Sequence, residues 1–386
     1  MNNNENLNLQ ISKLRKAKGI TQNELANVLG ISFQSVSKWE NGNAYPDITM
    51  LPLISQYFGV SVDFILGLDP RCNIKKQYFI AADQGGTKTH VLLCNMDGTI
   101  IGNTKTDGAC WFYSGIEKSI EYLSEAINHL KSQAGISSEQ IAFIVCGAAG
   151  INWDDECGMY TQAVEQKTHI KAYTYNDCAA AVYCDALEYE NRIALCAGTE
   201  FDAAVITPDL KTPYVYCNHT LPQDMGGTEI GRRAINAVLR ADEKLSPETT
   251  LTDKVLRYFD CNSIDNLLRG YRRQTLEKQP KGLTPIVFEL AKNGDSVSAK
   301  MLYDMAKNMS EYACGAIKKY ELQNKKVAII LAGGVFKNEY DPFYKCIKDT
   351  IRAICKSAEI IRTTNEPVDG AWNIGILKAK KYEEKK

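Results

Sequence analysis

The stretch TQNELANVLGISFQSVSKWENGNAYPDITML, residues 21–51, predicts short helices joined by a tight turn. Thr21 is a good N-cap, and Glu24, three residues later, can complete a capping box. Gly30 suits the left-handed conformation in which many helices end. The apolar residues between these signals predict the buried face of the first helix: Leu25, Val28 and Leu29.

The next helix is predicted to begin at the N-cap Ser32. Val36 and Trp39, three residues apart, predict its buried side. Four side chains then fall on the opposite side: Phe33, Gln34, Ser37 and Lys38. This opposite side is the part of the module that is free to recognise a partner.

Further helical patterns flank this pair and extend the prediction to five short helices over residues 7–67. Three apolar residues mark one face of the first of them: Leu7, Ile11 and Leu14. Gly19 closes that helix. Pro52 has no amide donor and fits only a first turn, which places the start of the fourth helix near Thr49. Amphipathic helices alone would favour a small bundle that docks another protein.

The order of motifs is more specific than the helical pattern. The TQxELA opening, the SxWExG end of the recognition helix and the VSxDxIL close resemble the Cro/phage-repressor-type (XRE) helix-turn-helix family. In such modules the recognition helix lies in the major groove of double-stranded DNA. The resemblance implies base contacts by Phe33, Gln34, Ser37 and Lys38, and phosphate contacts by Gln22, Ser35 and Asn41. Ser35 and Asn41 fit local capping equally well.

One module of this size makes few phosphate contacts, so tight operator binding is expected to need a homodimer on two half-sites. A basic run at Lys13, Arg15, Lys16 and Lys18 either extends the backbone contact or is a solvated face.

Composition limits the remaining choices. Lys plus Arg (45) and Asp plus Glu (46) nearly cancel across 386 residues, so any basic footprint is local. The 13 cysteines form neither a CxxC pair nor a Cys/His cluster, which predicts buried thiols in a reducing compartment. The sequence has neither the features of a signal peptide nor a membrane-spanning apolar stretch. We therefore expect a cytoplasmic protein with no membrane partner.

The pattern changes after the helical module. Residues 1–70 are predicted as the DNA-binding domain, 71–77 as a linker, and 78–386 as an α/β domain in which strands alternate with helices. A hairpin is expected to turn at Asp97 and Gly98. A mostly helical block follows between about residues 229 and 320.

Glycine-rich turns and one carboxylate follow the predicted strands. DQGGTKT, which begins at Asp83, forms a turn whose amides can cradle phosphate, although such a turn alone is more often a simple hairpin. Asp177 follows the strand KAYTY, where an ordinary helix cap is the alternative role. The segment AGT at 197–199 and the pair Gly333 and Gly334 form two further turns.

The segments DQGGTKT, CGAAG, NDCAAA, AGT, GGTEIGRRAI, LAGGVF and PVDGAWNIGIL resemble, in this order, the actin-like ATPase and sugar kinase superfamily. The resemblance is strongest to its BadF/BadG/BcrA/BcrD ATPase and N-acetylglucosamine kinase branch and covers residues 78 to about 380. It implies a two-lobed, ribonuclease H-like fold. Lobe I would span about 78–180 plus 368–384, and lobe II about 181–367.

The resemblance also implies ATP and Mg²⁺ as cofactors and an amino sugar or related small molecule as a partner. Asp83 would face the metal, and Asp177 would accept the proton of the acceptor hydroxyl. The nucleotide would contact Asp83, Gly85, Gly86, Thr87, Lys88, Thr89, Gly198, Thr199, Gly333 and Gly334.

The second phosphate turn departs from the family pattern, which reads close to GTGS. Here Glu200 and Phe201 replace a glycine and a serine, and a carboxylate beside phosphate is repulsive. Two functions stay open. In the first, the protein is a transcriptional regulator whose kinase-like domain binds ATP or an amino sugar as effector. In the second, it is an active N-acetylglucosamine-type kinase with an attached DNA-binding module.

Overall fold

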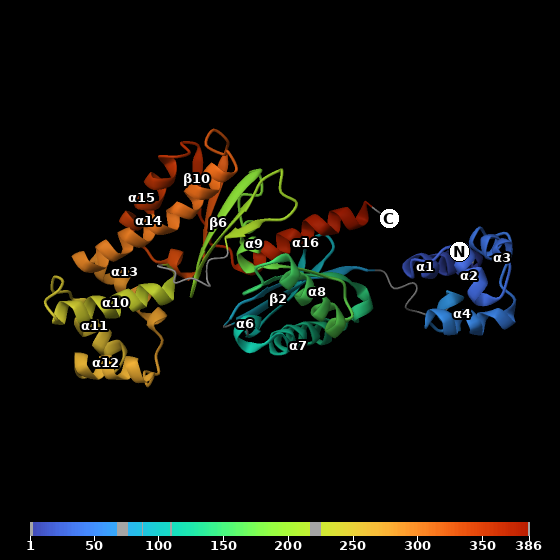
Figure 1. Cartoon of the computed structure of the whole chain (residues 1–386), viewed down its shortest axis with the longest axis horizontal. Helices are drawn as coiled ribbons and strands as arrows, with labels where there is room; N and C mark the ends of the chain where they lie inside the picture. Colours follow the sequence, from blue (N-terminus) through green and yellow to red (C-terminus); the bar gives the residue numbers. More distant parts are fainter. Residues whose placement is uncertain (1–2, 68–75, 87, 109, 217–224, 385–386) are drawn as a thin grey trace. The chain divides into compact units, whose positions relative to one another are not determined.

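The computed structural model describes residues 3–67, 76–86, 88–108, 110–216 and 225–384 (Figure 1). The chain separates into two compact units, residues 1–77 and 78–386. Each unit has its own hydrophobic core. Among the described residues, no helix is long and apolar enough to cross a membrane.

The described part of the N-terminal unit is entirely helical. Its helices are α1 (Asn3–Ala17), α2 (Gln22–Leu29), α3 (Phe33–Glu40), α4 (Leu51–Phe58) and α5 (Val62–Ile65), with a 3₁₀ turn at Ile48–Met50. Thr21 and Glu24 form the predicted capping box, and Gly30 ends α2 with a φ of 67°. Pro52 lies in the first turn of α4, as its missing amide requires.

The core of this unit lies where the helices meet. Its fully buried side chains include Ile11, Leu25, Val36, Ile54 and Ile65. The predicted burial of Val28 is wrong, because its side chain is 53% exposed. Ala26 is buried instead, so the core-facing side of α2 is centred on Leu25, Ala26 and Leu29 and turns Val28 outward.

The first sheet of the C-terminal unit has the strand order β3-β2-β1-β4-β5. Its strands are β1 (Tyr78–Gln84), β2 (Lys88–Asn95), β3 (Ile100–Asp107), β4 (Ile141–Ala148) and β5 (Ala172–Asn176). β1, β2 and β3 form an antiparallel meander that includes the predicted hairpin, whereas β4 and β5 continue the sheet in parallel with β1.

The second sheet repeats this topology with the order β8-β7-β6-β9-β10. Its strands are β6 (Asn191–Ala197), β7 (Phe201–Ile206), β8 (Tyr214–Tyr216), β9 (Val327–Ala332) and β10 (Ala358–Arg362). Again the first three strands are antiparallel and the last two run parallel to the first. The unit therefore contains the same sheet twice.

Helices cover both sheets (Figure 1). The first sheet is accompanied by α6 (Trp111–Ser114), α7 (Ile116–Ala134), α8 (Asp154–Thr168), α9 (Asp177–Ala181) and α16 (Pro367–Glu383). The second is accompanied by α10 (Gly227–Asp242), α11 (Leu251–Tyr258), α12 (Ile264–Arg273), α13 (Thr284–Lys292), α14 (Ser296–Lys319) and α15 (Asp341–Arg352). The predicted helical block is confirmed.

The alternation of side chains along β1 positions the candidate site. Ile80 and Ala82 pack toward α7 and α8, whereas Phe79 and Ala81 pack toward α16. Asp83 continues the second series, because successive strand residues point to opposite faces. The carboxylate therefore lies on the α16 side of the sheet, at the strand's carboxyl end. The fold is that of an all-α helix-turn-helix unit followed by an α/β unit of two sheets.

Candidate functional site

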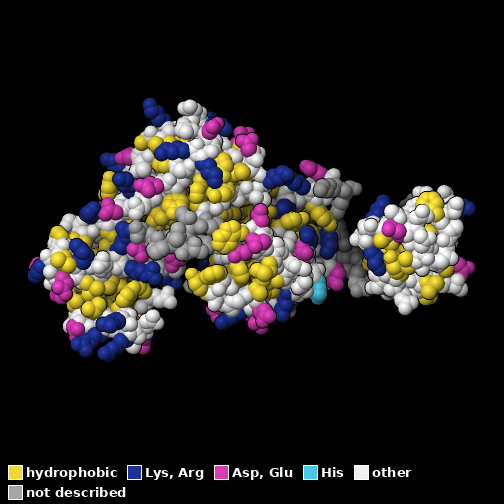
Figure 2. Space-filling model, viewed as in Figure 1, with side chains coloured by type: hydrophobic (Ala, Val, Ile, Leu, Met, Phe, Trp, Pro, Cys, Tyr) yellow, Lys and Arg dark blue, Asp and Glu magenta, His cyan; other side chains and the backbone are white. Residues whose placement is uncertain are grey.

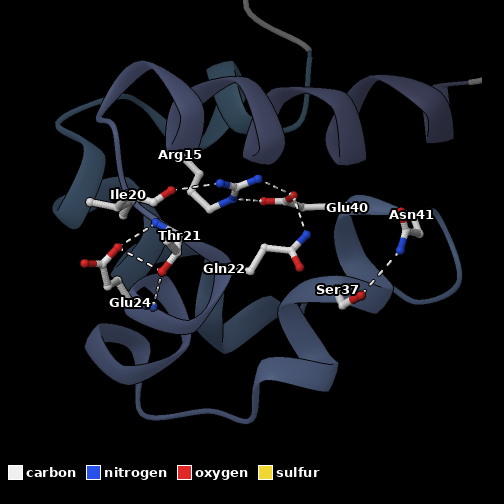
Figure 3. Close-up of polar contacts among 8 residues, drawn as sticks. All are labelled: Arg15, Ile20, Thr21, Gln22, Glu24, Ser37, Glu40 and Asn41. Carbon is white, nitrogen blue, oxygen red and sulfur yellow. Dashed lines mark hydrogen bonds and ion pairs between the residues drawn. The ribbon is translucent and has the colours of Figure 1, made fainter.

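The outward side of α3 is the candidate DNA-binding face. Phe33, Gln34 and Lys38 are exposed, whereas Val36 and Trp39 on the opposite side are buried. Ser37 is half-buried and accepts a hydrogen bond of 3.4 Å from the side-chain amide of Asn41 (Figure 3). The helix thus presents the side chains predicted for base contact on one accessible side, and their roles on DNA stay predictions.

A buried ion pair fixes the orientation of this helix. Arg15 donates from Nε to Oε1 of Glu40 at 2.6 Å and from Nη2 to Oε2 at 2.9 Å (Figure 3). Arg15 also donates to the carbonyl oxygen of Ile20 at 2.8 Å. Only 12% of the Arg15 side chain and 5% of the Glu40 side chain are exposed. Within the basic run of α1, Arg15 therefore holds α3 rather than facing solvent.

Gln22 binds the same Glu40 carboxylate. Its amide nitrogen donates to Oε2 of Glu40 at 2.8 Å, and the side chain is half-buried. The predicted phosphate contact of Gln22 would have to use its second amide hydrogen. Ser35 and Asn41 show the local contacts that were the alternative to phosphate binding. Ser35 Oγ lies 2.9 Å from Ser32 Oγ, and Asn41 is the residue that ends α3.

The first glycine-rich turn joins β1 to β2 in the C-terminal unit. Its backbone closes through a hydrogen bond of 2.9 Å from the Gly85 amide to the Lys88 carbonyl. Gly86 and the Lys88 side chain are exposed, and Thr87 lies outside the described residues. Thr89 is fully buried, and its hydroxyl has no hydrogen-bond partner among the described residues. Thr89 is therefore covered in this structure, unlike Gly86 and Lys88, and its contact with nucleotide stays a prediction.

Asp177 is the first residue of α9, directly after β5. The capping role is taken by Asn176, whose side-chain oxygen accepts from the amides of Cys178 at 2.8 Å and Ala179 at 3.3 Å. Asp177 accepts from the Cys178 amide as well, at 3.0 Å, and is half-buried. Because its neighbour caps the helix, the Asp177 carboxylate is not needed for that purpose.

The structure brings Asp83 and Asp177 into electrostatic range of each other. Burial raises the pKa of Asp83 to about 7, and the charge of Asp177 contributes to the rise. The positive charge of Lys88 lowers the pKa of Asp83, whereas the negative charge of Glu366 raises it further. Two carboxylates that are close enough to interact disfavour each other's ionisation, and a nearby cation would relieve this cost.

The donor set fits Mg²⁺ held largely by water and phosphate. Among the described residues, no group of three His, Cys, Asp or Glu side chains could enclose a metal ion. Mg²⁺ typically keeps several waters and binds through one or two carboxylates plus the substrate's phosphates. Asp83, with Asp177 nearby, supplies that kind of oxygen ligand. When bound, the ion would neutralise charge on the phosphates.

Glu366 was not predicted from the sequence. It immediately precedes α16, and its carboxylate lies 3.7 Å from Lys88 Nζ, 3.0 Å from Lys105 Nζ and 2.8 Å from Nδ1 of His90. The hydrogen bond from Lys105 lowers the pKa of Glu366 to about 2 despite partial burial. A phosphate bound by Lys88 would therefore compete with Glu366. Residues 88 and 366 are far apart in the chain, so only the folded structure reveals the pair.

The second glycine-rich turn joins β6 to β7. Gly198, Thr199 and Glu200 are exposed, and the Gly198 amide donates to the Glu200 carbonyl at 3.0 Å. The expectation that the Phe201 ring stands at the phosphate position is wrong. Phe201 is the first residue of β7, and its buried ring packs edge-on against Tyr312 with centroids 5.2 Å apart. The departure from the family pattern that remains at the surface is Glu200.

The third turn lies against the second. Gly333 has a φ of 102°, and a Cβ atom added to it would lie 2.5 Å from the Ala197 carbonyl oxygen. Only glycine fits this close approach to the end of β6. Gly334 has open space around its Cα. The contact between chain segments therefore explains Gly333 by itself, and adenosine binding by both glycines stays a prediction.

Residues beside Asp177 add polar groups that the sequence did not single out. The Asn176 amide donates to Oδ1 of Asn152 at 2.9 Å, which links the end of β5 to the loop after β4. The Trp111 indole donates to the Gly150 carbonyl of the same loop at 2.6 Å. The loop after β4, α6 and the start of α9 thus form one side of the candidate acceptor site.

These features define a DNA-binding helix-turn-helix module joined to a sugar-kinase-like unit. The chain belongs to the BadF/BadG/BcrA/BcrD ATPase family, whose model matches residues 82–375. A helix-turn-helix model matches residues 11–65.

Known proteins match each part of the chain. N-acetylmuramic acid/N-acetylglucosamine kinase of Clostridium acetobutylicum is 25% identical over 70% of this chain and 90% of its own length. The HTH-type transcriptional activator BcrR of Enterococcus faecalis is 36% identical over 18% of this chain and 39% of its own length.

Two solved structures share the fold. A ROK family glucokinase from Streptomyces griseus has a TM-score of 0.53 at 16% identity and covers 78% of this chain and 98% of its own. A ROK family transcriptional regulator, a homologue of the Escherichia coli Mlc protein, has a TM-score of 0.53 at 12% identity and covers 99% of both chains.

Proposed function

We propose that the protein is a transcriptional regulator whose kinase-like unit binds ATP with Mg²⁺ and an amino sugar as effectors. The outward side of α3 would contact double-stranded DNA. Two copies acting as a homodimer would present two such helices to two half-sites, since one module neutralises few phosphates. Effector binding would then shift the population of dimers that fit the operator.

The observation that carries this proposal is the exposed Glu200 at the Gly198–Thr199 turn. Catalysis of phosphoryl transfer depends on positioning and on neutralising charge at the phosphates. A carboxylate at the turn expected to hold phosphate opposes both. Reversible binding of an effector tolerates such a repulsive contact better than catalysis does. The fold shared with a transcriptional regulator over 99% of the chain adds support.

Turnover as an N-acetylglucosamine-type kinase is the second candidate, and a different observation favours it. Asp83 and Asp177 lie within electrostatic range, and Asn176 rather than Asp177 is the main cap of α9. A carboxylate that is not needed as the cap is suited to accept a hydroxyl proton. The relative from Clostridium acetobutylicum is named as a kinase of two amino sugars.

One experiment separates the two functions. ADP release is measured with Mg²⁺-ATP and N-acetylglucosamine or glucosamine, and operator binding of the full chain is titrated with and without the same ligands. The regulator is expected to release ADP negligibly and to change operator affinity when sugar is added. Phosphorylation at an ordinary rate, above about 1 per second, would overturn the regulator. Absence of turnover and of any ligand effect on DNA binding would overturn both functions.

Asp177→Asn provides the matched variant. If the protein is a kinase, sugar and ATP binding should persist, because the amide keeps the size of the side chain. Turnover should fall by about 10²–10⁴-fold because the proton acceptor is lost. If the protein is a regulator, the variant should keep the sugar-dependent change in operator affinity.

A further inference from the structure

Three aromatic side chains beside the candidate acceptor site are exposed to solvent. Phe112 is 61% exposed, Tyr113 83% and Trp153 50%. The rings of Phe112 and Tyr113 lie edge to face with their centroids 5.3 Å apart. The rings of Trp111 and Phe112 lie edge to face as well, with their centroids 6.3 Å apart. Hydrophobic side chains gather where α6 lies in the space-filling view (Figure 2). These rings contribute little to the core, so packing does not explain them.

The helix α6, which carries Phe112 and Tyr113, is anchored to the loop after β4. Trp111 is fixed by its indole hydrogen bond to Gly150. The Cys110 thiol donates to the Ala149 carbonyl at 3.4 Å. A Cβ atom added at Gly150 would lie 3.4 Å from Phe112 Cβ, so the helix and the loop are in direct contact. Aromatic side chains on a rigid support lose little entropy when a ligand covers them.

Hydrogen bonds and chain connections link these aromatic residues to the candidate acceptor site. Trp153 directly follows Asn152, whose side-chain oxygen accepts from Asn176, the neighbour of Asp177. At the other end, a Cβ atom added at Gly86 of the first turn would lie 3.7 Å from Cys110 Cβ. A ligand that places one hydroxyl at Asp177 therefore has aromatic surface beside it on α6 and at Trp153.

The charges around the cluster indicate what kind of ligand it takes. Asp154, Asp155 and Glu156 open α8 directly after Trp153. Acidic side chains disfavour a nucleic acid or another polyanion at this surface. Neutral or cationic sugar rings suit it, because their C–H faces pack on aromatic rings.

We propose that Phe112, Tyr113 and Trp153 form a second sugar subsite, so that the ligand of this unit is an uncharged or cationic amino-sugar disaccharide or longer glycan. One ring would occupy the site at Asp177, and the next would stack on the aromatic cluster. This inference rests on the proposed amino-sugar site and specifies the size of its ligand.

The test is calorimetric titration of the full chain with N-acetylglucosamine and with its β-1,4-linked disaccharide. The wild-type protein should bind the disaccharide about tenfold more tightly, which is the upper range for an added aromatic contact. Tyr113→Ala and Trp153→Ala should each reduce the ratio of the two affinities toward one. Both side chains are at least half exposed, so the melting temperature should change little.

Tyr303→Ala is the matched control, because Tyr303 is 55% exposed on α14 of the other lobe. It should keep the wild-type ratio. Equal affinities for the two sugars in the wild-type protein, or a tenfold preference that survives both aromatic variants, would overturn the subsite while leaving the monosaccharide site intact. Binding of neither sugar would instead overturn the proposed function together with the subsite.

Discussion

The buried pair of Arg15 and Glu40 should control the stability of the DNA-binding unit. Arg15→Met keeps the length of the side chain but leaves the Glu40 carboxylate with the Gln22 amide and without its cation. Both side chains are largely excluded from water, at 12% and 5% exposure. Removing one partner of such a pair costs about 3–5 kcal/mol, because the remaining charge is buried unpaired.

Hydrogen exchange measured by mass spectrometry on the full chain resolves this effect locally. A loss of about 3–5 kcal/mol should speed exchange in peptides from α2 and α3 by about two to three and a half orders of magnitude. Peptides from β4 in the other unit should exchange as in the wild-type protein. The double variant Arg15→Met with Glu40→Leu is the control, since apolar replacement of a whole buried pair is often neutral. Wild-type exchange in the single variant would refute the reasoning.

The same pair predicts a dependence on acid. Burial raises the pKa of Glu40, but the hydrogen bonds from Arg15 and Gln22 more than offset this, and the pKa is lowered from 4.5. The folded unit therefore binds this proton less readily than the unfolded chain does. The stabilisation is fully present above pH 4.5 and is lost as the pH falls below it. Arg15→Met should weaken this dependence in the same exchange experiment.

Three further variants test single side chains. Gln34→Ala should weaken specific DNA binding by about 1–3 kcal/mol and relax one base position, as titration against single-base operator variants measures; unchanged affinity in a folded protein would exclude Gln34 from base contact. Glu200→Gln should tighten ATP binding about two- to fivefold in calorimetry, and equal affinity would show that this turn does not meet phosphate. Phe201→Ser should instead lower the free energy of unfolding by about 3–5 kcal/mol in denaturant titration, because its ring is buried; wild-type stability would contradict the packing described.

Local signals in the sequence predicted most of the helices and strands. Helix caps act within one turn of the chain, so their effect can be predicted from the sequence without knowing the tertiary structure. Examples are the capping residues Thr21 and Ser32 and the helix-ending Gly30. Val28 was misassigned because several apolar residues of a short helix fit one face, and the neighbouring helices decide which of them is buried. Phe201 was misassigned for a related reason. Strand alternation, rather than motif position, determines where its ring points.

The candidate site was predictable only where its residues lie near strand ends. Asp83, one residue before the carboxyl end of β1, and Asp177, directly after β5, are close to such ends, and parallel strands bring their carboxyl ends to one edge of a sheet. Glu366 and Asn152 could not be found in this way. Glu366 meets Lys88 across 278 residues of sequence, and Asn152 is defined by its bond to Asn176 rather than by any motif. Contacts that depend on tertiary packing leave no local signal.

The repeated topology of the two sheets gives the two glycine-rich turns equivalent places in the fold. In each sheet a glycine-rich turn follows the first strand, Gly85–Gly86 after β1 and Gly198–Thr199 after β6. The two turns hold equivalent places in the repeat, yet the first ends in Lys88 and the second in Glu200. A phosphate chain held by both turns, as we propose, would meet a cation at one turn and an anion at the other. Because Glu366 already engages Lys88, the proposed nucleotide would compete with one carboxylate and approach another. Such a site would favour weak, reversible binding, which is what the proposed effector role requires.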